Sequence, residues 1–158
     1  MSTKREQGFT LIELLVVTII VGILATLVIM TLGGVQSKNR NVKRQAGINT
    51  LQSRLETYYV EKSKYPTLTE LNSATWRKDN LKDLNDGVLR DPQWESKIPA
   101  CTGERNDTTM AAAPTVKCYS YQATAADGSA CNDLVACAQY SLTATLEGGE
   151  KYVKTSLN

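Results

Sequence analysis

Histidine is absent from the 158-residue chain. Because histidine is the commonest general base near neutral pH and the commonest metal ligand, its absence argues against most hydrolase mechanisms and zinc sites. The Asp, Glu, Lys and Cys residues that remain do not occur at spacings typical of a catalytic site, and no nucleotide-binding motif is present. The sequence therefore predicts a protein that is not an enzyme and needs no cofactor or metal.

A strong excess of charge of either sign is also lacking. Lysine and arginine total 18 residues against 16 aspartates and glutamates, which gives a formal net charge of +2. This near-neutral balance gives no support for nucleic acid or for acidic partners.

The chain has four cysteines but no Cys-x-x-Cys pair, so a structural zinc site is not predicted. Cys101, Cys118, Cys131 and Cys137 all lie in the C-terminal half, which suits two disulfides formed in an oxidising compartment. Four buried free thiols are the alternative. Of the three connectivities we favour Cys101–Cys118 with Cys131–Cys137, because neighbouring cysteines close the shorter loops.

A long apolar run does occur near the N-terminus, from Phe9 to Leu32, with Glu13 as its only ionisable residue. As a helix it would span about 36 Å, enough to cross a hydrocarbon core of about 30 Å. Its only uncharged polar side chains are threonines, whose hydroxyls can bond back to their own helix. The run has no polar face, which excludes an amphipathic surface helix.

The residues before this run do not fit an ordinary secretory signal. Such a signal has an apolar region of about 7 to 15 residues, followed by a small-residue cleavage site. Here the run is longer, and Gly8 stands before it, after a polar leader that contains Lys4 and Arg5. This order allows removal of residues 1–8 on the cytoplasmic side while the apolar helix stays in the mature protein.

Residues 8–13 read Gly-Phe-Thr-Leu-Ile-Glu and head the apolar run. The segment resembles the prepilin signature of type IV pilins, secretion pseudopilins and competence pilins. The resemblance implies cleavage by a prepilin peptidase between Gly8 and Phe9, N-methylation of the Phe9 amine, and assembly into a helical filament. It also implies that Glu13 of one subunit faces the Phe9 amine of a neighbour.

The position of Glu13 has a physical consequence. An acidic residue in the middle of a membrane costs about 2.5–3.5 kcal/mol, and less near an interface. We therefore hypothesise that pairing of Glu13 in the filament sets register and recruitment rather than adding net stability. A snorkelling or protonated carboxylate at the end of a simple membrane anchor is the alternative.

The basic residues after the span, Lys38, Arg40, Lys43 and Arg44, raise a question of orientation. By the positive-inside rule they would place the C-terminal side in the cytoplasm. The cysteines and the leader favour the opposite orientation, with the head outside, and we adopt it. The basic cluster is then expected to rest on outer-leaflet phosphates before assembly and on acidic neighbours afterwards.

Beyond the span, the pattern becomes amphipathic and predicts a helix to about Ser63, ended by Pro66. The expected packing stripe consists of Val42, Ala46, Ile48, Leu51, Leu55, Tyr58 and Tyr59. Many pilins carry a proline in the later part of this helix. Here Gly22 and Gly33-Gly34 are the positions at which local unwinding or bending is expected instead.

The predicted fold class is α+β: a long N-terminal α-helix packed on a small antiparallel β-sheet head. Strands are expected at 118–123, 140–146 and 152–157, with a Gly148-Gly149 turn before the last and a capping box at Thr67–Glu70. The expected organisation is a leader at 1–8, a transmembrane and assembly helix at 9–32, an amphipathic helix at 33–65 and a globular head at 66–158.

Two weaker signals lie in the head. The residues Asp127-Gly128-Ser129, Asn132 and Asp133 offer oxygen ligands for calcium, although a polar disulfide loop explains them better. Asn106 lies in a glycosylation sequon within an expected surface loop at 100–115.

These features together predict a structural subunit of a type IV pilus-like filament that supports adhesion or motility. The alternatives are a type II secretion pseudopilin, a competence pilin for DNA uptake, and a membrane-anchored enzyme, which the lack of histidine disfavours. Expected partners are further copies of the chain, a prepilin peptidase and an ATPase-driven pilus or secretion machinery. The subunit is expected to wait as a single-pass protein of the cytoplasmic membrane, before joining a surface pilus or periplasmic pseudopilus.

Overall fold

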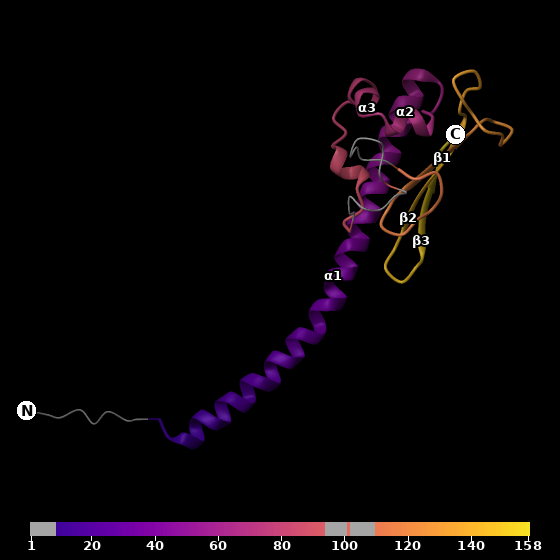
Figure 1. Cartoon of the computed structure of the whole chain (residues 1–158). Helices are drawn as coiled ribbons and strands as arrows, with labels where there is room; N and C mark the ends of the chain where they lie inside the picture. The colour runs from indigo at the N-terminus through magenta and orange to yellow at the C-terminus, as the bar shows by residue number, and fades with distance from the viewer. Residues whose placement is uncertain (1–8, 94–100, 102–109) are drawn as a thin grey trace, which may run out of the picture. The chain divides into compact units, whose positions relative to one another are not determined.

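The computed structural model describes residues 9–93, 101 and 110–158, with the backbone alone at 29–33. The chain divides into two compact units, Met1–Lys38 and Asn39–Asn158. The element order is one long helix, two short helices, a 3-10 turn and three strands, which matches the predicted α+β class (Figure 1).

Helix α1, Leu11–Lys62, has 52 residues and supplies residues to both units. The helical assignment runs through Gly22, Gly33 and Gly34, so the local unwinding expected at these glycines does not occur. The helix ends one residue before the predicted boundary, where Ser63 adopts a left-handed backbone with φ of 55°. Pro66 follows and prevents the helix from resuming.

The core of the second unit forms where α1 meets the head. The buried α1 side chains include Ile48, Leu51, Leu55 and Tyr58, as predicted. Val42 and Ala46 are exposed, so their place in the expected stripe was wrong. The buried stripe starts instead at Arg44, which precedes the buried residues at steps of three and four along the same helix face.

The sheet has three antiparallel strands, β1 (Ser120–Thr124), β2 (Gln139–Thr145) and β3 (Lys151–Thr155), in the order β1-β2-β3. Each strand lies within two residues of its predicted bounds. Tyr140, Leu142 and Ala144 alternate along β2 and are buried on its inward face. Gly148 and Gly149 adopt φ of 94° and 92° in the β2–β3 turn, a backbone that favours glycine.

Two short helices and a 3-10 turn follow α1 in the head. Helix α2, Leu68–Asn72, begins with the predicted capping box, in which Thr67 and Glu70 bond to each other's backbone N–H. Helix α3, Ala74–Asn80, and the 3-10 turn η1, Asp86–Leu89, were not predicted. Pro92 and Gln93 form a turn, whereas Asn106 and most of the loop expected at 100–115 lie outside the described residues.

Candidate functional site

Thr10 and Glu13 cap the N-terminal end of α1. The Thr10 backbone N–H and hydroxyl donate to Glu13 Oε2 at 2.9 and 2.8 Å. The Glu13 N–H donates back to the Thr10 hydroxyl oxygen at 3.3 Å. This is a capping box, and its signal, a threonine three residues before a glutamate, was overlooked in the sequence. No described residue donates to the other carboxylate oxygen, Oε1.

The predicted cleavage site lies at the edge of the described residues. Phe9 is 89% exposed, and the helix starts two residues later. Gly8 and the leader fall outside the described part of the chain. Cleavage and N-methylation therefore stay predictions.

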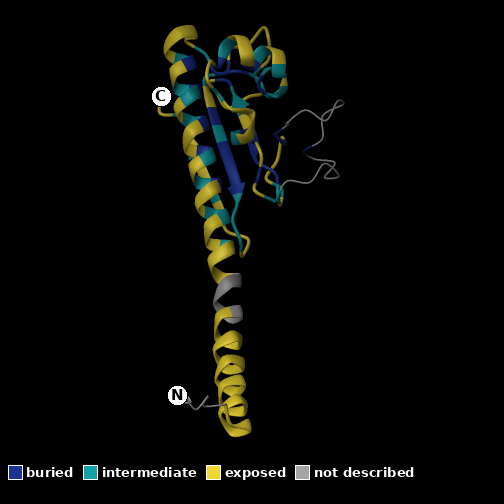
Figure 2. Ribbon diagram, turned by 90° about the vertical axis from the view of Figure 1, so that its left-hand side faces the viewer, coloured by how far each residue is buried: buried dark blue, intermediate teal, exposed yellow. Residues whose placement is uncertain are grey.

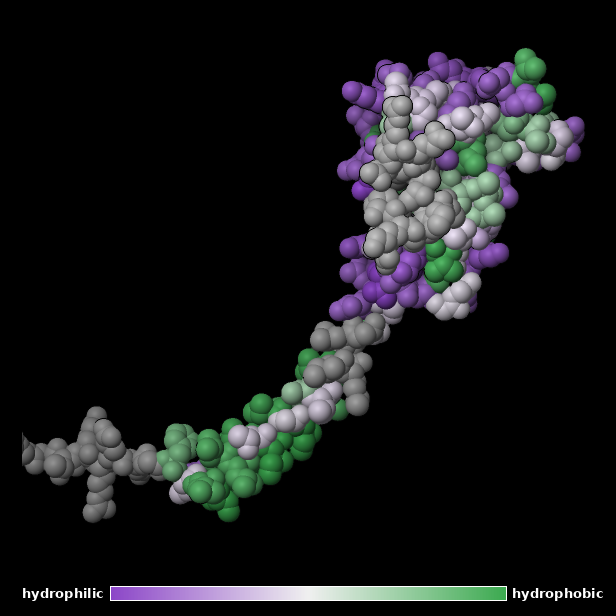
Figure 3. Space-filling view, in the orientation of Figure 1, coloured by the Kyte–Doolittle hydropathy of each residue, from purple (hydrophilic) through white to green (hydrophobic). Residues whose placement is uncertain are grey.

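The apolar part of α1 meets the length and composition of one membrane span. The candidate span is Leu11–Val28, with a mean hydropathy of 2.8 and none of its residues buried. Figures 2 and 3 show this part of the helix as exposed and hydrophobic. The Thr18 and Thr26 hydroxyls donate to the carbonyls of Leu15 and Ile23, as expected for threonine in an apolar helix. A helix apolar on all sides needs lipid or other helices around it.

Arg44 lies in the interior of the second unit, although it is charged. Its guanidinium donates to both carboxylate oxygens of Asp91, at 2.6 and 3.1 Å, and the Arg44 and Asp91 side chains are 2% and 1% exposed. Further acceptors are Glu147 Oε1 at 3.0 Å, Asn41 Oδ1 at 3.1 Å and Gln93 Oε1 at 2.9 Å. A buried charge is tolerated when it is paired and hydrogen-bonded in this way.

Arg40 extends this network towards the surface. Its Nε donates to Glu147 Oε1 at 2.7 Å. Hydrogen bonds from Arg40 and Arg44 lower the pKa of Glu147 to about 2. The expectation that the basic cluster rests on lipid phosphates was therefore wrong for Arg44, which is buried and paired with acids of the folded head. Lys38 and Lys43 remain exposed.

Glu56 of α1 accepts hydrogen bonds from the C-terminal part of the head. Its carboxylate accepts bonds from the hydroxyls of Tyr140 at 2.7 Å and Tyr65 at 2.9 Å, and from the Asn158 side-chain amide at 3.3 Å. Burial raises the pKa of Tyr65 to about 12, with Glu56 adding to the shift. Burial and the bond to Glu56 also raise the pKa of Tyr140, so both hydroxyls stay protonated as donors at neutral pH.

The four cysteines form two disulfides, Cys101–Cys118 and Cys131–Cys137, which is the pairing favoured from the sequence. The loop at 127–135 uses its polar side chains in turns. Asp127 Oδ1 accepts the Ser129 N–H at 2.9 Å, and Asn132 Oδ1 accepts the Leu134 N–H at 2.9 Å. Within the described ranges, no group of three or more His, Cys, Asp or Glu residues is placed to hold a metal ion.

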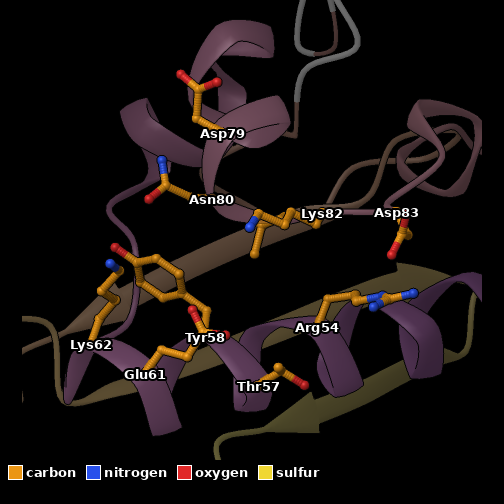
Figure 4. A pocket seen from close by; sticks show the side chains of 10 residues that line it. Arg54, Thr57, Tyr58, Glu61, Lys62, Asp79, Asn80, Lys82 and Asp83 are labelled. Carbon is orange, nitrogen blue, oxygen red and sulfur yellow. The ribbon is translucent and has the colours of Figure 1, made fainter.

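A cavity of about 320 Å³ lies between α1 and the segment from α3 onward (Figure 4). Its charged lining alternates in sign: Arg54, Glu61, Lys62, Asp79, Lys82 and Asp83. The hydroxyl of Thr57 in this lining donates to the Ser53 carbonyl at 3.0 Å, so it is not activated by a base.

Residues 3–29 match the family described as the prokaryotic N-terminal methylation motif. The type II secretion system core protein G of Dickeya chrysanthemi is 42% identical over 75 residues, which are 48% of this chain and 49% of that protein. The core protein G of Klebsiella pneumoniae is 39% identical over 96 residues, 57% of this chain and 69% of that protein.

The ComG operon protein 3 homolog of Bacillus licheniformis is 33% identical over 90 residues, which cover 54% of this chain and 90% of that protein. The chain spans about half the length of most of the curated relatives it matches. No solved structure matches it significantly.

Proposed function

The chain belongs to the family of type IV pilins and type II secretion pseudopilins, and from this premise we propose that it is the structural subunit of a secretion pseudopilus. The observation that carries the proposal is the exposed apolar segment of α1, headed by Thr10 and Glu13. Most of the named relatives are core proteins of type II secretion, and they support a secretory role over the adhesive or motile pilus expected from the sequence.

In this proposal a prepilin peptidase cuts between Gly8 and Phe9, and the new Phe9 amine is methylated. The subunit waits in the cytoplasmic membrane with its head outside. Assembly then replaces lipid contacts along the apolar segment with contacts to neighbouring helices. Because lipid is as apolar as leucine, close packing and polar pairing must favour the filament, rather than the hydrophobic effect.

Glu13 supplies the polar pairing. Its Oε2 accepts both bonds from Thr10, while Oε1 accepts none from the described residues. We infer that Oε1 receives the Phe9 amine of a neighbouring copy. A carboxylate oxygen without a partner is costly in apolar surroundings. The filament is therefore expected to adopt the axial register between subunits that brings a cation to this oxygen.

The experiment is complementation of a strain that has a complete type II secretion system but lacks its core pseudopilin. The wild-type chain is expected to restore export of the secreted enzymes, measured as their activity in the culture medium. A chain with Gly8→Ala tests processing in the same strain and is expected to stay uncut and inactive. Correctly processed, membrane-inserted wild-type chain without restored export would contradict the secretory role.

A competence filament is the second candidate, because the ComG relative is covered over 90% of its length. The two candidate functions are distinguished by the transformation frequency that the chain restores in a naturally competent strain lacking its own major competence pilin. The near-neutral charge of the chain supports a structural part in such a filament rather than strong DNA binding.

A further inference from the structure

A cavity of about 540 Å³ opens in the second unit beside the first α1 turns of that unit. Its lining comes from α1, from the segment around η1 and from Tyr119, and it includes the exposed cations Lys43 and Arg90. This volume lies in the range of protein sites that bury a ligand, about 300 to 1,000 Å³. Ala46, Val88 and Pro92 give the cavity apolar walls, so an occupant with an apolar tip would fit.

Tyr119 gives this cavity an unusual polar group. The residue is 2% exposed, and its hydroxyl has no hydrogen bond to any residue that the structure describes. Burial raises the pKa of Tyr119, so the hydroxyl stays protonated and is a donor. Buried polar groups nearly always have a partner, and a buried donor that lines a cavity is placed to donate to an acceptor that enters it.

Gly47 keeps the space in front of this hydroxyl open. A Cβ atom at Gly47 would lie 3.4 Å from the Tyr119 hydroxyl and 3.2 Å from the Val88 carbonyl oxygen. The second contact is tighter than ordinary van der Waals packing, because the backbone carbonyl cannot easily move away. Any larger side chain at this position would therefore narrow the cavity at its polar end.

The loop 131–137 has the complementary features. The Cys131–Cys137 disulfide closes it, and Asn132 Oδ1 accepts the N–H groups of Leu134 and Val135 at 2.9 and 3.0 Å. The side chain of Leu134 nevertheless points to solvent, at 95% exposure. Asp133, the only charged residue of the loop, is exposed beside it. A constrained loop loses little conformational entropy when it binds.

The loop and the cavity lie at opposite ends of the second unit. The cavity borders α1 from Lys43 to Thr50, whereas the Tyr65 N–H just past the end of α1 donates to the Cys137 carbonyl at 2.8 Å. Helix rise separates Thr50, the last α1 residue in the cavity lining, from Lys62 by about 18 Å. The two features therefore cannot meet within one copy. A contact between them in two copies is heterologous, and such contacts generate an open filament when the rotation between copies does not close into a ring.

We propose that the loop 131–137 of one copy docks into this cavity of the next copy in the filament. Leu134 enters the cavity as the apolar anchor, and Asp133 pairs with Lys43 at the rim. The Tyr119 hydroxyl donates to an acceptor oxygen of the incoming loop. The inference rests on the proposed function, since it requires that copies of the chain form a filament.

Charge reversal tests the pairing. Asp133→Lys, Lys43→Glu and the double variant are expressed in cells that hold a complete secretion machinery, and sheared filaments are quantified. Each single reversal is expected to lower filament yield about tenfold, and the double variant to recover most of it. Asp79→Lys and Lys151→Glu, also exposed, are the matched controls and should assemble as the wild type does. A double variant no better than its parents would overturn the pairing.

Two further variants test the cavity itself. Leu134→Ala is expected to lower filament yield about tenfold, whereas Leu157→Ala, at a second exposed leucine, leaves it unchanged. Tyr119→Phe removes a hydroxyl without a partner, so the melting temperature of the unassembled chain should stay equal or rise while filament yield falls. If the filament yield is unchanged in both Leu134→Ala and Tyr119→Phe, the docking is overturned. The proposed function still stands in that case, because the wild-type chain forms filaments. Absence of wild-type filaments would contradict both.

Discussion

Arg44 brings a full positive charge into the interior of the second unit and holds three parts of the chain together. Its acceptors lie on the turn after η1, at the end of the β2–β3 hairpin and on α1 itself. The pair with Asp91 is nearly inaccessible to solvent, so neither charge can be hydrated when its partner is removed. The position of the head against α1 in this unit thus depends on a few charge-assisted hydrogen bonds as well as on apolar packing.

Removal of the Asp91 carboxylate is expected to destabilise the second unit strongly. Asp91→Ala leaves the buried guanidinium with Glu147 as its only acid among the described residues, and a broken buried pair costs about 3–5 kcal/mol. Urea unfolding of the full chain in detergent measures the change. Asp79→Ala, at an exposed acid, should change stability by less than about 0.5 kcal/mol. Equal effects of the two substitutions would contradict the role of the network.

Glu147 makes stability depend on acid pH. Its pKa is lowered to about 2 by Arg40 and Arg44, whereas it is 4.5 for an unperturbed glutamate. A lowered pKa in the folded state means that the stabilisation is complete above about pH 4.5 and is lost as the pH falls towards 2. The melting temperature of the wild type should therefore fall more steeply between pH 5 and pH 2 than that of Glu147→Gln.

Glu150→Gln is the control for this measurement, since Glu150 lies in the same turn and is exposed. It should reproduce the wild-type pH dependence. If the melting temperatures of the wild type and Glu147→Gln change in parallel with pH, the ion pair contributes nothing to the loss of stability at acid pH.

At the scale of elements, several predictions from neighbouring residues were correct, whereas the capping signals of Thr10 at α1 and Ser73 at α3 were overlooked although they are equally local. The end of α1, the capping box of α2 and the three strands follow from periodicity, proline and glycine, and the structure confirms them. The buried position of Arg44 could not be predicted, because its partners lie 47 and 103 residues away and an apolar-stripe rule passes over charged residues. For the same reason Val42 and Ala46 were wrongly assigned to the core.

The capping box of α2 gives a prediction at this scale. Thr67→Ala removes the acceptor for the Glu70 N–H, and loss of a threonine N-cap costs about 1 kcal/mol. Chemical unfolding of the full chain measures the loss. Thr69→Ala, an exposed threonine within the same helix, is the comparison and should cost clearly less. A larger loss for Thr69→Ala would indicate that packing rather than capping fixes this helix.

For the whole molecule, the central question is what surrounds the apolar half of α1. The candidate span is exposed on all sides in a single copy, and among the described residues the side chain of its one acid accepts bonds from Thr10 alone. The candidate assembly residues could be predicted from Gly8, Phe9 and Glu13, because the motif is local. The Thr10–Glu13 capping box is just as local but was overlooked, whereas the cavity beside Tyr119 depends on side-chain geometry that no local pattern shows.

The measurement that tests the account most directly is the yield of sheared filaments from Glu13→Ala beside the wild type, in cells that supply the peptidase and the secretion machinery. Intact mass must first show that both chains begin at Phe9 and are present in the membrane in equal amounts. We predict abundant wild-type filaments and almost none from Glu13→Ala, because the variant offers no acceptor for the neighbouring amine. Filaments of Glu13→Ala at wild-type yield would contradict the claim that this carboxylate directs assembly.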